Sequence, residues 1–212
     1  MRKVLNLFAG IGGNREKWGD DVSVTAVENN QLIADFYKER FPKDEVVVSD
    51  ALDFLEERYH EYDFVWASPP CQSHGQYRHA VGVLAKGFRP LVPDMRSLYG
   101  TVVFLRKYHK GYWAVENTVP YYTPLIFPTV ILARHLIWSN FPIAKKKFSK
   151  SDIRVKNKLS DFGSIGNEIM KTKIPNKRQA LRNCVDSDLG KYVFDQHLLT
   201  FRTRDGIDCS TM

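Results

Sequence analysis

Cysteine is scarce in this chain and has no paired spacing. The 212 residues contain three cysteines, Cys71, Cys184 and Cys209. An odd number of widely separated cysteines argues against both a disulfide framework and a cysteine zinc site. Long apolar runs are also lacking, because the N-terminal run at residues 4–8 is too short for a signal peptide or a membrane span. The sequence therefore predicts a soluble, cytoplasmic protein with neither a metal site nor a membrane segment.

Most of the chain lacks any excess of charge. Residues 1–144 hold 16 basic and 16 acidic residues, although the whole chain has a net charge of +7. Seven basic residues and one acidic residue fall within residues 145–158. A basic segment beside a neutral body is typical of a surface that binds a polyanion, and the alternative is a solvated, disordered basic loop.

Short apolar runs alternate with helical patterns along the chain. This alternation predicts one α/β domain with a Rossmann-like, doubly wound and mostly parallel sheet. A chain of this length can build one sizeable core. We expect strands at residues 4–8, 22–27, 45–48, 63–67, 112–115 and 134–138, and helices at residues 31–41, 51–57, 94–107 and 187–199.

Glycine or polar residues follow several of the predicted strands. A glycine-rich loop at residues 9–14 follows the first strand, Glu28 ends the second, and Cys71 follows the fourth. Ligands of such sheets bind at the carboxyl ends of strands, at the point where the strand order reverses. If the first and fourth strands are neighbours there, the glycine loop and Cys71 face one cleft.

The glycine loop and two acids have the features of a nucleotide site. Gly10, Gly12 and Gly13 permit positive φ and a close approach of a ligand, although their spacing is not the full G-x-G-x-x-G pattern. Glu28 is placed to accept from ribose hydroxyls. Asp50, after the third strand, is placed to cap the next helix and equally to reach a ligand at the same edge, and the two roles are compatible.

Cys71 stands in a stiff turn, in the stretch Ser-Pro-Pro-Cys-Gln at residues 68–72. Two adjacent prolines fix two φ angles and remove two amide donors, so the chain must leave the sheet in one direction. We therefore expect Cys71 to be accessible at the end of the sheet and not packed in the core. The alternative is the commoner role of a lone cysteine, a small apolar core residue. Residues 72–93 then form a long loop, which is expected to close over a substrate.

Together these pieces resemble the DNA cytosine-5 methyltransferases. The resemblance rests on Asn-Leu-Phe-Ala-Gly-Ile-Gly-Gly at residues 6–13, Glu28, Pro-Pro-Cys-Gln at 69–72, Val-Glu-Asn at 115–117 and Arg134, in the family's order. The resemblance covers about residues 3–143, and residues 183–185 resemble the family's closing motif more weakly. In one departure, Leu132 stands where the family usually has the first of two arginines.

The resemblance implies a covalent mechanism and a methyl donor. Cys71 would add to C6 of cytosine, Glu116 would hold the N3 edge and supply a proton, and Arg134 would contact the base carbonyl. The implied cofactor is S-adenosyl-L-methionine. The residues expected to bind it are Phe8, Gly10, Gly12, Gly13, Glu28, Asp50, Pro70 and Asn183.

Double-stranded DNA is the implied partner, because the chemistry requires a cytosine flipped out of the duplex. The resemblance and the charge pattern predict nucleic-acid contacts from Gln72, Ser73, Arg78, Lys145, Lys146, Lys147, Lys150 and Arg154.

The predicted organisation has a reduced recognition region. We expect a catalytic core at residues 1–140, a basic target-recognition segment at 141–182, a C-terminal helix returning to the core at 183–199 and a tail at 200–212. The recognition segment is short for the family, so the sequence predicts a short target or a protein partner that supplies the missing readout. Restriction-modification, solitary and phage enzymes all fit this pattern.

Other activities explain fewer of these residues. A tRNA cytosine-5 methyltransferase shares the catalytic core, but the Cys-Phe-Thr motif of that branch is absent. Amino-group methyltransferases typically carry an aromatic residue where this chain has Cys71. A catalytically silent nucleic-acid-binding homologue would not need Cys71, Glu116 and Arg134, and a nicotinamide oxidoreductase would leave the Pro-Pro-Cys-Gln stretch unexplained.

Overall fold

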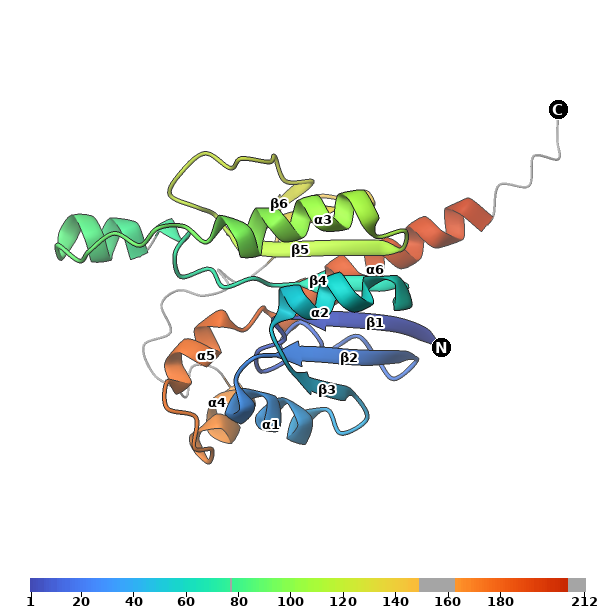
Figure 1. Cartoon of the computed structure of the whole chain (residues 1–212), viewed down its shortest axis with the longest axis horizontal. Helices are drawn as coiled ribbons and strands as arrows, with labels where there is room; N and C mark the ends of the chain where they lie inside the picture. The colour runs from blue at the N-terminus through green and yellow to red at the C-terminus, as the bar shows by residue number, and fades with distance from the viewer. Residues whose placement is uncertain (77, 149–162, 206–212) are drawn as a thin grey trace.

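The chain folds around a mostly parallel sheet. The computed structural model describes residues 1–76, 78–148 and 163–205. In this part of the chain one seven-stranded sheet has the order β3-β2-β1-β4-β5-β7-β6, with β7 antiparallel to both neighbours (Figure 1). The doubly wound sheet predicted from the sequence is confirmed. Its strands are β1 (Arg2–Leu7), β2 (Val22–Glu28), β3 (Glu45–Val48), β4 (Phe64–Ala67), β5 (Tyr112–Thr118), β6 (Val130–Leu132) and β7 (His135–Ser139).

Helices cover both faces of this sheet. In Figure 1, α2 and α3 lie in front of the strands and α6 lies behind them. The α-helices are α1 (Gln31–Arg40), α2 (Ala51–Arg58), α3 (Thr101–Tyr108), α4 (Gly163–Met170), α5 (Lys177–Asn183) and α6 (Ser187–Asp205). Three tighter or wider helical segments are η1 (Tyr59–Glu61, 3-10), η2 (Arg78–Ala85, π) and η3 (Arg96–Gly100, π).

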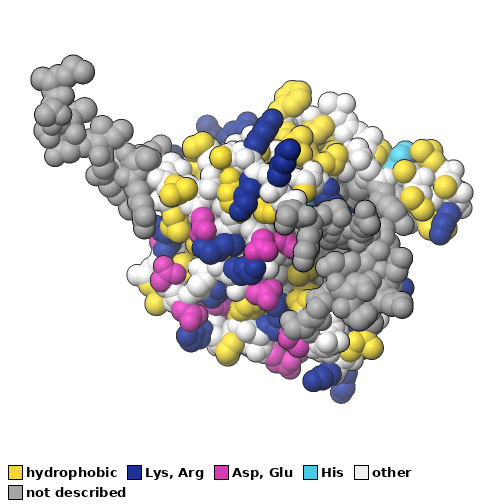
Figure 2. Space-filling view, turned by 180° about the vertical axis from the view of Figure 1, so that it is seen from behind, with side chains coloured by type: hydrophobic (Ala, Val, Ile, Leu, Met, Phe, Trp, Pro, Cys, Tyr) yellow, Lys and Arg dark blue, Asp and Glu magenta, His cyan; other side chains and the backbone are white. Residues whose placement is uncertain are grey.

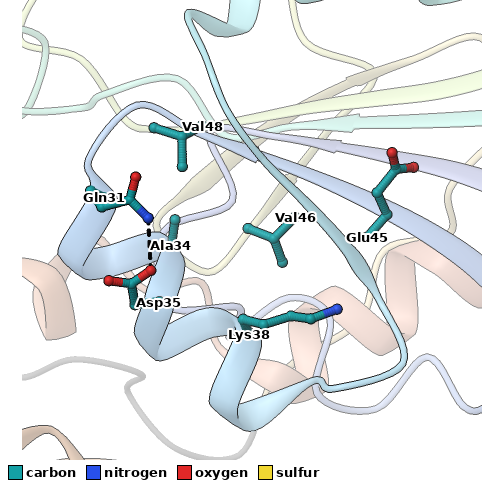
Figure 3. Close-up of a pocket in the computed structure, with 7 residues that line it drawn as sticks. All are labelled: Gln31, Ala34, Asp35, Lys38, Glu45, Val46 and Val48. Carbon is teal, nitrogen blue, oxygen red and sulfur yellow. Dashed lines mark hydrogen bonds between the residues drawn. The ribbon is translucent and has the colours of Figure 1, made fainter.

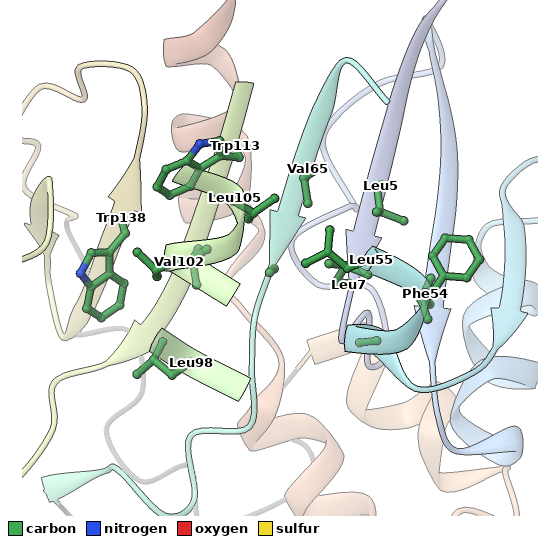
Figure 4. Close-up of a cluster of buried hydrophobic side chains, with 14 of the residues drawn as sticks. Leu5, Leu7, Phe54, Leu55, Val65, Leu98, Val102, Leu105, Trp113 and Trp138 are labelled. Carbon is green, nitrogen blue, oxygen red and sulfur yellow. The ribbon is translucent and has the colours of Figure 1, made fainter. Parts of the chain in front are cut away.

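The alternation of strand side chains creates two cores. On one face, Leu7, Val65 and Val115 pack against α2 and α3, and Figure 4 shows part of this cluster. On the other face, Trp66 lies beneath α6, in a cluster with Trp18 and other buried apolar residues. Because successive residues of a strand point to opposite faces, strands buried on both faces read as continuous apolar runs.

The strand order reverses between β1 and β4. Leu7, the last residue of β1, pairs with Val27 of β2 on one side and with Ala67 of β4 on the other. The chain therefore leaves the carboxyl end of β1 in one direction and the carboxyl end of β4 in the other. This arrangement confirms the expected neighbours and places the glycine loop and Cys71 at one edge of the sheet.

Four local predictions are corrected. Residues 72–93 are not entirely loop, because they contain η2. Glu116 lies within β5 rather than beyond its end. Arg134 lies in the turn between β6 and β7, next to Ala133 at φ 52°, and not in a strand. Helix α6 does not end at residue 199 but continues to Asp205.

Candidate active site

The turn that carries Cys71 is fixed by hydrogen bonds from three parts of the chain. The Asn117 side-chain amide donates to the Pro69 carbonyl at 2.9 Å, which ties the turn to β5. The amides of His74 and Gly75 both donate to the Cys71 carbonyl at 3.0 Å. The Ser68 amide donates to the Leu7 carbonyl at 3.3 Å. The orientation of the turn therefore depends on β1 and β5 as well as on the two prolines.

Glu116 and Arg134 both act electrostatically on Cys71 at this edge. The pKa of the Cys71 thiol is raised to about 11, first by burial and then by the Glu116 carboxylate, while the Arg134 guanidinium opposes the rise. The structure thus brings together the three residues for which the sequence predicts catalytic roles. In the free protein Cys71 is a protonated thiol near neutral pH, so its proton must be removed before it can attack.

We expect the alkylation of Cys71 to report this environment. The rate with iodoacetamide should rise about tenfold per pH unit between roughly pH 8 and 10, because the thiolate is the reactive form and remains a minor species throughout. Glu116→Gln should shift this curve to lower pH and Arg134→Gln to higher pH, since they remove opposite charges. Mass spectrometry of the Cys71 peptide measures the rate. A plateau near pH 9 in the wild-type protein would contradict the assignment.

The sequence did not predict one partner of this site, His135. Its Nδ1 lies 2.5 Å from Glu116 Oε1, and both side chains are buried. His74 is a second buried histidine of this region, and burial lowers its pKa. Its Nδ1 lies 2.5 Å from the Tyr122 hydroxyl. No sequence motif marked either histidine, because both contacts depend on pairing between distant segments.

The glycine loop is joined to Glu28 through its backbone. The Gly10 amide donates to Glu28 Oε2 at 3.0 Å, and the Asn30 amide donates to Oε1 at 3.0 Å. Burial raises the pKa of Glu28, and these backbone donors oppose the rise. Each carboxylate oxygen keeps a further lone pair for a hydroxyl donor. Gly10, at φ 53°, has an open Cβ position, so these residues fit a nucleoside with a ribose diol.

Gly12 and Gly13 are required by packing within the protein. A Cβ on Gly12 would meet the Phe41 ring at 2.3 Å, and one on Gly13 would meet Cys184 Sγ at 2.1 Å and the Val185 carbonyl oxygen at 2.2 Å. At the Cβ positions of these two glycines, the atoms in close contact therefore belong to other residues of the protein, whereas the sequence predicted the close approach of a ligand. The segment that follows α5 packs directly on the glycine loop.

The other residues predicted to bind the cofactor occupy varied positions. Phe8 follows β1 at φ 54° and is half-buried. Asp50 caps α2, because its Oδ1 accepts from the Leu52 amide at 2.8 Å and the Asp53 amide at 3.2 Å. Pro70 is exposed beside Cys71, and Asn183 is exposed at the end of α5. Their contact with a cofactor remains a prediction.

Two groups of residues predicted to contact DNA are described. Gln72 and Ser73 are half-buried in the turn after Cys71, and Ser73 Oγ accepts from the Asp94 amide at 3.0 Å. Arg78 begins η2. The exposed lysines Lys145, Lys146 and Lys147 lie outside the turn of Cys71.

These lysines run beside α6. Lys146 Nζ lies 4.7 Å from the centroid of the Tyr192 ring, and the Tyr192 hydroxyl donates to the Ala144 carbonyl at 2.9 Å. Figure 2 views the molecule from behind and shows Lys and Arg side chains mixed with acidic ones on this face. Lys150 and Arg154 lie outside the described residues.

Two surface hollows lie away from these residues. One, of about 330 Å³, is lined by seven residues of α1 and β3, and Gln31 and Asp35 hydrogen-bond within it (Figure 3). The other, of about 780 Å³, lies where α1 meets the segment around α4. No residue predicted to belong to the active site lines either hollow. These two hollows are therefore separate from the candidate site, which is identified by its converging polar groups.

Residues 2–87 match the family model of the C-5 cytosine-specific DNA methylases. The resemblance to cytosine-5 DNA methylases is confirmed over this segment. The matching methylase segment contains the glycine loop, Glu28 and Cys71. Glu116 and Arg134 lie beyond it, and the sheet brings them to Cys71.

Several solved structures are similar to parts of the chain. A DNMT2 mutant from Spodoptera frugiperda is 22% identical over 56% of this chain and 36% of its own, with a TM-score of 0.39. A SAM-dependent methyltransferase from Agrobacterium tumefaciens is 17% identical over 57% and 40%, with a TM-score of 0.39. A conserved hypothetical protein from Streptococcus pyogenes is 15% identical over 65% and 84%, with a TM-score of 0.40. The aligned region thus spans less than half of the Spodoptera and Agrobacterium proteins. No curated protein sequence matches the chain.

The described residues contain neither a membrane-spanning helix nor a cluster of metal-ligating side chains. Across residues 1–76, 78–148 and 163–205, no helix has the length and apolar character needed to cross a membrane. Within the same ranges, no three His, Cys, Asp or Glu side chains gather in a way that would hold a metal ion.

Proposed function

We propose that this chain is a DNA cytosine-5 methyltransferase that uses S-adenosylmethionine. The observation that carries the proposal is the convergence of Cys71, Glu116 and Arg134 beside the turn where β1 and β4 diverge. The family match of residues 2–87 supports it independently. A nucleophile, a carboxyl group and a guanidinium at one edge are the groups that addition to a cytosine ring requires.

The reaction begins at Cys71. Its thiol proton passes to Glu116, and Glu116 gives a proton to cytosine N3, so the carboxyl group ends as it began. The S–C6 bond forms as the C5=C6 π bond breaks, and the electron pair is delocalised through C5 and C4 to N3. Arg134 binds the base carbonyl and favours the thiolate. After C5 is methylated, the C5 proton is lost to water, Cys71 leaves C6 as the thiolate and the N3 proton returns to Glu116, which restores the aromatic ring.

Glu28 and the glycine loop would hold the cofactor at the neighbouring strand ends. Glu28 accepts the ribose hydroxyls, and Phe8 and Gly10 line the adjoining surface. When bound, S-adenosylmethionine supplies an electrophilic methyl group. The residues at the ends of β1 and β4 would thus hold the methyl donor beside a flipped cytosine.

DNA recognition would be divided between two regions of the chain. The turn after Cys71, with Gln72 and Ser73, approaches the flipped base. The lysine segment at 145–147 supplies phosphate contacts, which are sensitive to salt and carry no sequence information. Because few residues would contact bases, we expect the enzyme to recognise a short target sequence or to rely on a protein partner that makes further base contacts.

Glu28→Ala should weaken cofactor binding by about 10- to 100-fold, the loss expected for hydrogen bonds to a charged group. Isothermal titration of S-adenosylmethionine measures the change. Glu61→Ala is a matched control, because Glu61 is a surface acid that precedes β4 and pairs with Arg58 at the opposite edge. Equal affinities for the wild-type protein and Glu28→Ala would remove Glu28 from the site.

The function is tested by incubating the protein with labelled S-adenosylmethionine and either duplex DNA or RNA. Base-resolution sequencing then locates the modified position. Label at cytosine C5 of DNA is the expected result, and it also identifies the target sequence. Label in RNA alone would replace the proposal with a tRNA-type activity. No label in either polymer, with the cofactor bound, would indicate a silent nucleic-acid-binding homologue.

A further inference from the structure

The register of the sheet places His135 beside Glu116 on one face. Glu116 of β5 pairs directly with Ile137 of β7, and His135 lies two residues from Ile137 on the same strand. Residues two apart on a strand share a face, so His135 is the diagonal neighbour of Glu116. Arg134, the adjacent residue, lies in the turn that follows β6.

The contact between the two side chains is short and buried. His135 Nδ1 lies 2.5 Å from Glu116 Oε1, and the two residues are 5% and 6% exposed. Within the described part of the chain, His135 Nε2 is buried without a hydrogen-bond partner. A proton carried only on Nε2 would be buried without an acceptor, which is costly, whereas a proton on Nδ1 has the Glu116 carboxylate as its acceptor. Nδ1–H therefore donates to Glu116.

We propose that His135 is a positioning residue that holds Glu116 for proton transfer to cytosine N3. This inference rests on the proposed function. The Nδ1–H donor fixes Oε1 and leaves Oε2 for the base. It also stabilises the carboxylate that forms when N3 takes the proton. The other ionisable side chains near Glu116 are those of Cys71 and Arg134, and both residues lie in turns outside β7.

The test measures addition of Cys71 without the methyl donor. In duplex DNA tritiated at cytosine C5, addition at C6 and protonation of N3 let C5 take a proton from water, and reversal releases tritium. We expect His135→Leu, which removes the donor, to slow this release by about 100-fold, at the lower end of general acid-base effects. His135→Asn, whose amide reaches the position of Nδ1, should stay within about threefold of wild type.

Three further measurements separate positioning from a merely structural role. In a Glu116→Gln background, His135→Leu should cause no additional loss, because it acts through the group already removed. Cofactor affinity and melting temperature should be close to wild type in the single variants. Wild-type exchange by His135→Leu would overturn the inference, as would equal losses in folded His135→Leu and His135→Asn. If the wild-type protein itself releases no tritium and transfers no methyl group, the proposed function fails and the inference fails with it.

Discussion

Cys71→Ser is expected to reduce methyl transfer to DNA by about 10⁴-fold or more, the scale of loss when a catalytic nucleophile is removed. A serine hydroxyl is far less acidic than a thiol, and the carboxylate of Glu116 already disfavours a second negative charge at this position. Most of the predicted cofactor residues lie outside the turn of Cys71, and Pro70, which adjoins it, is unchanged in this variant. Affinity for S-adenosylmethionine should therefore remain within about threefold of wild type.

Cys184→Ser provides the matched control for this substitution. Cys184 packs against Gly13, and burial raises the pKa of its thiol to about 12. The same chemical change there should leave most of the activity, because this sulfur is unreactive and only packs against neighbouring residues. Initial rates with labelled cofactor measure both variants. Substantial activity in Cys71→Ser would remove Cys71 from the mechanism, and loss of cofactor binding would show that its effect is indirect.

Asp44→Asn should lower the free energy of unfolding by about 3–5 kcal/mol, the range for breaking a buried ion pair. Asp44 accepts two hydrogen bonds from Arg15, at 2.9 and 3.0 Å, and a third from the Tyr37 hydroxyl at 2.9 Å. The Arg15 and Asp44 side chains are only 7% and 2% exposed. Loss of the carboxylate leaves the guanidinium buried without its counter-charge, next to the glycine loop.

Asp20→Asn makes the same chemical change in an exposed pair. Asp20 lies 3.2 Å from Lys43, and the two side chains are 77% and 76% exposed. Because solvent screens such pairs, the expected loss is at most about 0.5 kcal/mol. Urea unfolding followed by circular dichroism compares the two variants. Similar midpoints for Asp44→Asn and Asp20→Asn would show that the buried pair contributes no more to stability than the exposed one.

The parallel half of the sheet was predictable because its signals are local. Each of the strands β1 to β5 is a short apolar run, and its carboxyl end is marked by glycine, a polar residue or proline in the sequence. Helix α1 likewise ends beside Pro42, as proline chemistry requires. Once β1 and β4 are neighbours, Cys71 and the glycine loop must share an edge.

The antiparallel part was harder to predict because it depends on pairing between distant residues. The hairpin of β6 and β7 starts with a three-residue strand, which carries too little periodicity to be recognised. Pairing with β7 continues along β5 past Glu116, and its register places His135 next to the Glu116 carboxylate. Helices α4 and α5 were not predicted either. Short elements gain their stability from tertiary packing rather than from local propensity.

The most direct test of this account is trapping of the covalent intermediate at Cys71. A pool of random-sequence duplexes containing 5-fluorocytosine is incubated with the protein and S-adenosylmethionine, since fluorine at C5 cannot leave as a proton does. Mass spectrometry should then find a peptide in which Cys71 is joined to a methylated fluorocytosine, and Cys71→Ser should form none. An adduct at Cys184 or Cys209, or methylation of DNA without any adduct, would contradict a mechanism centred on Cys71.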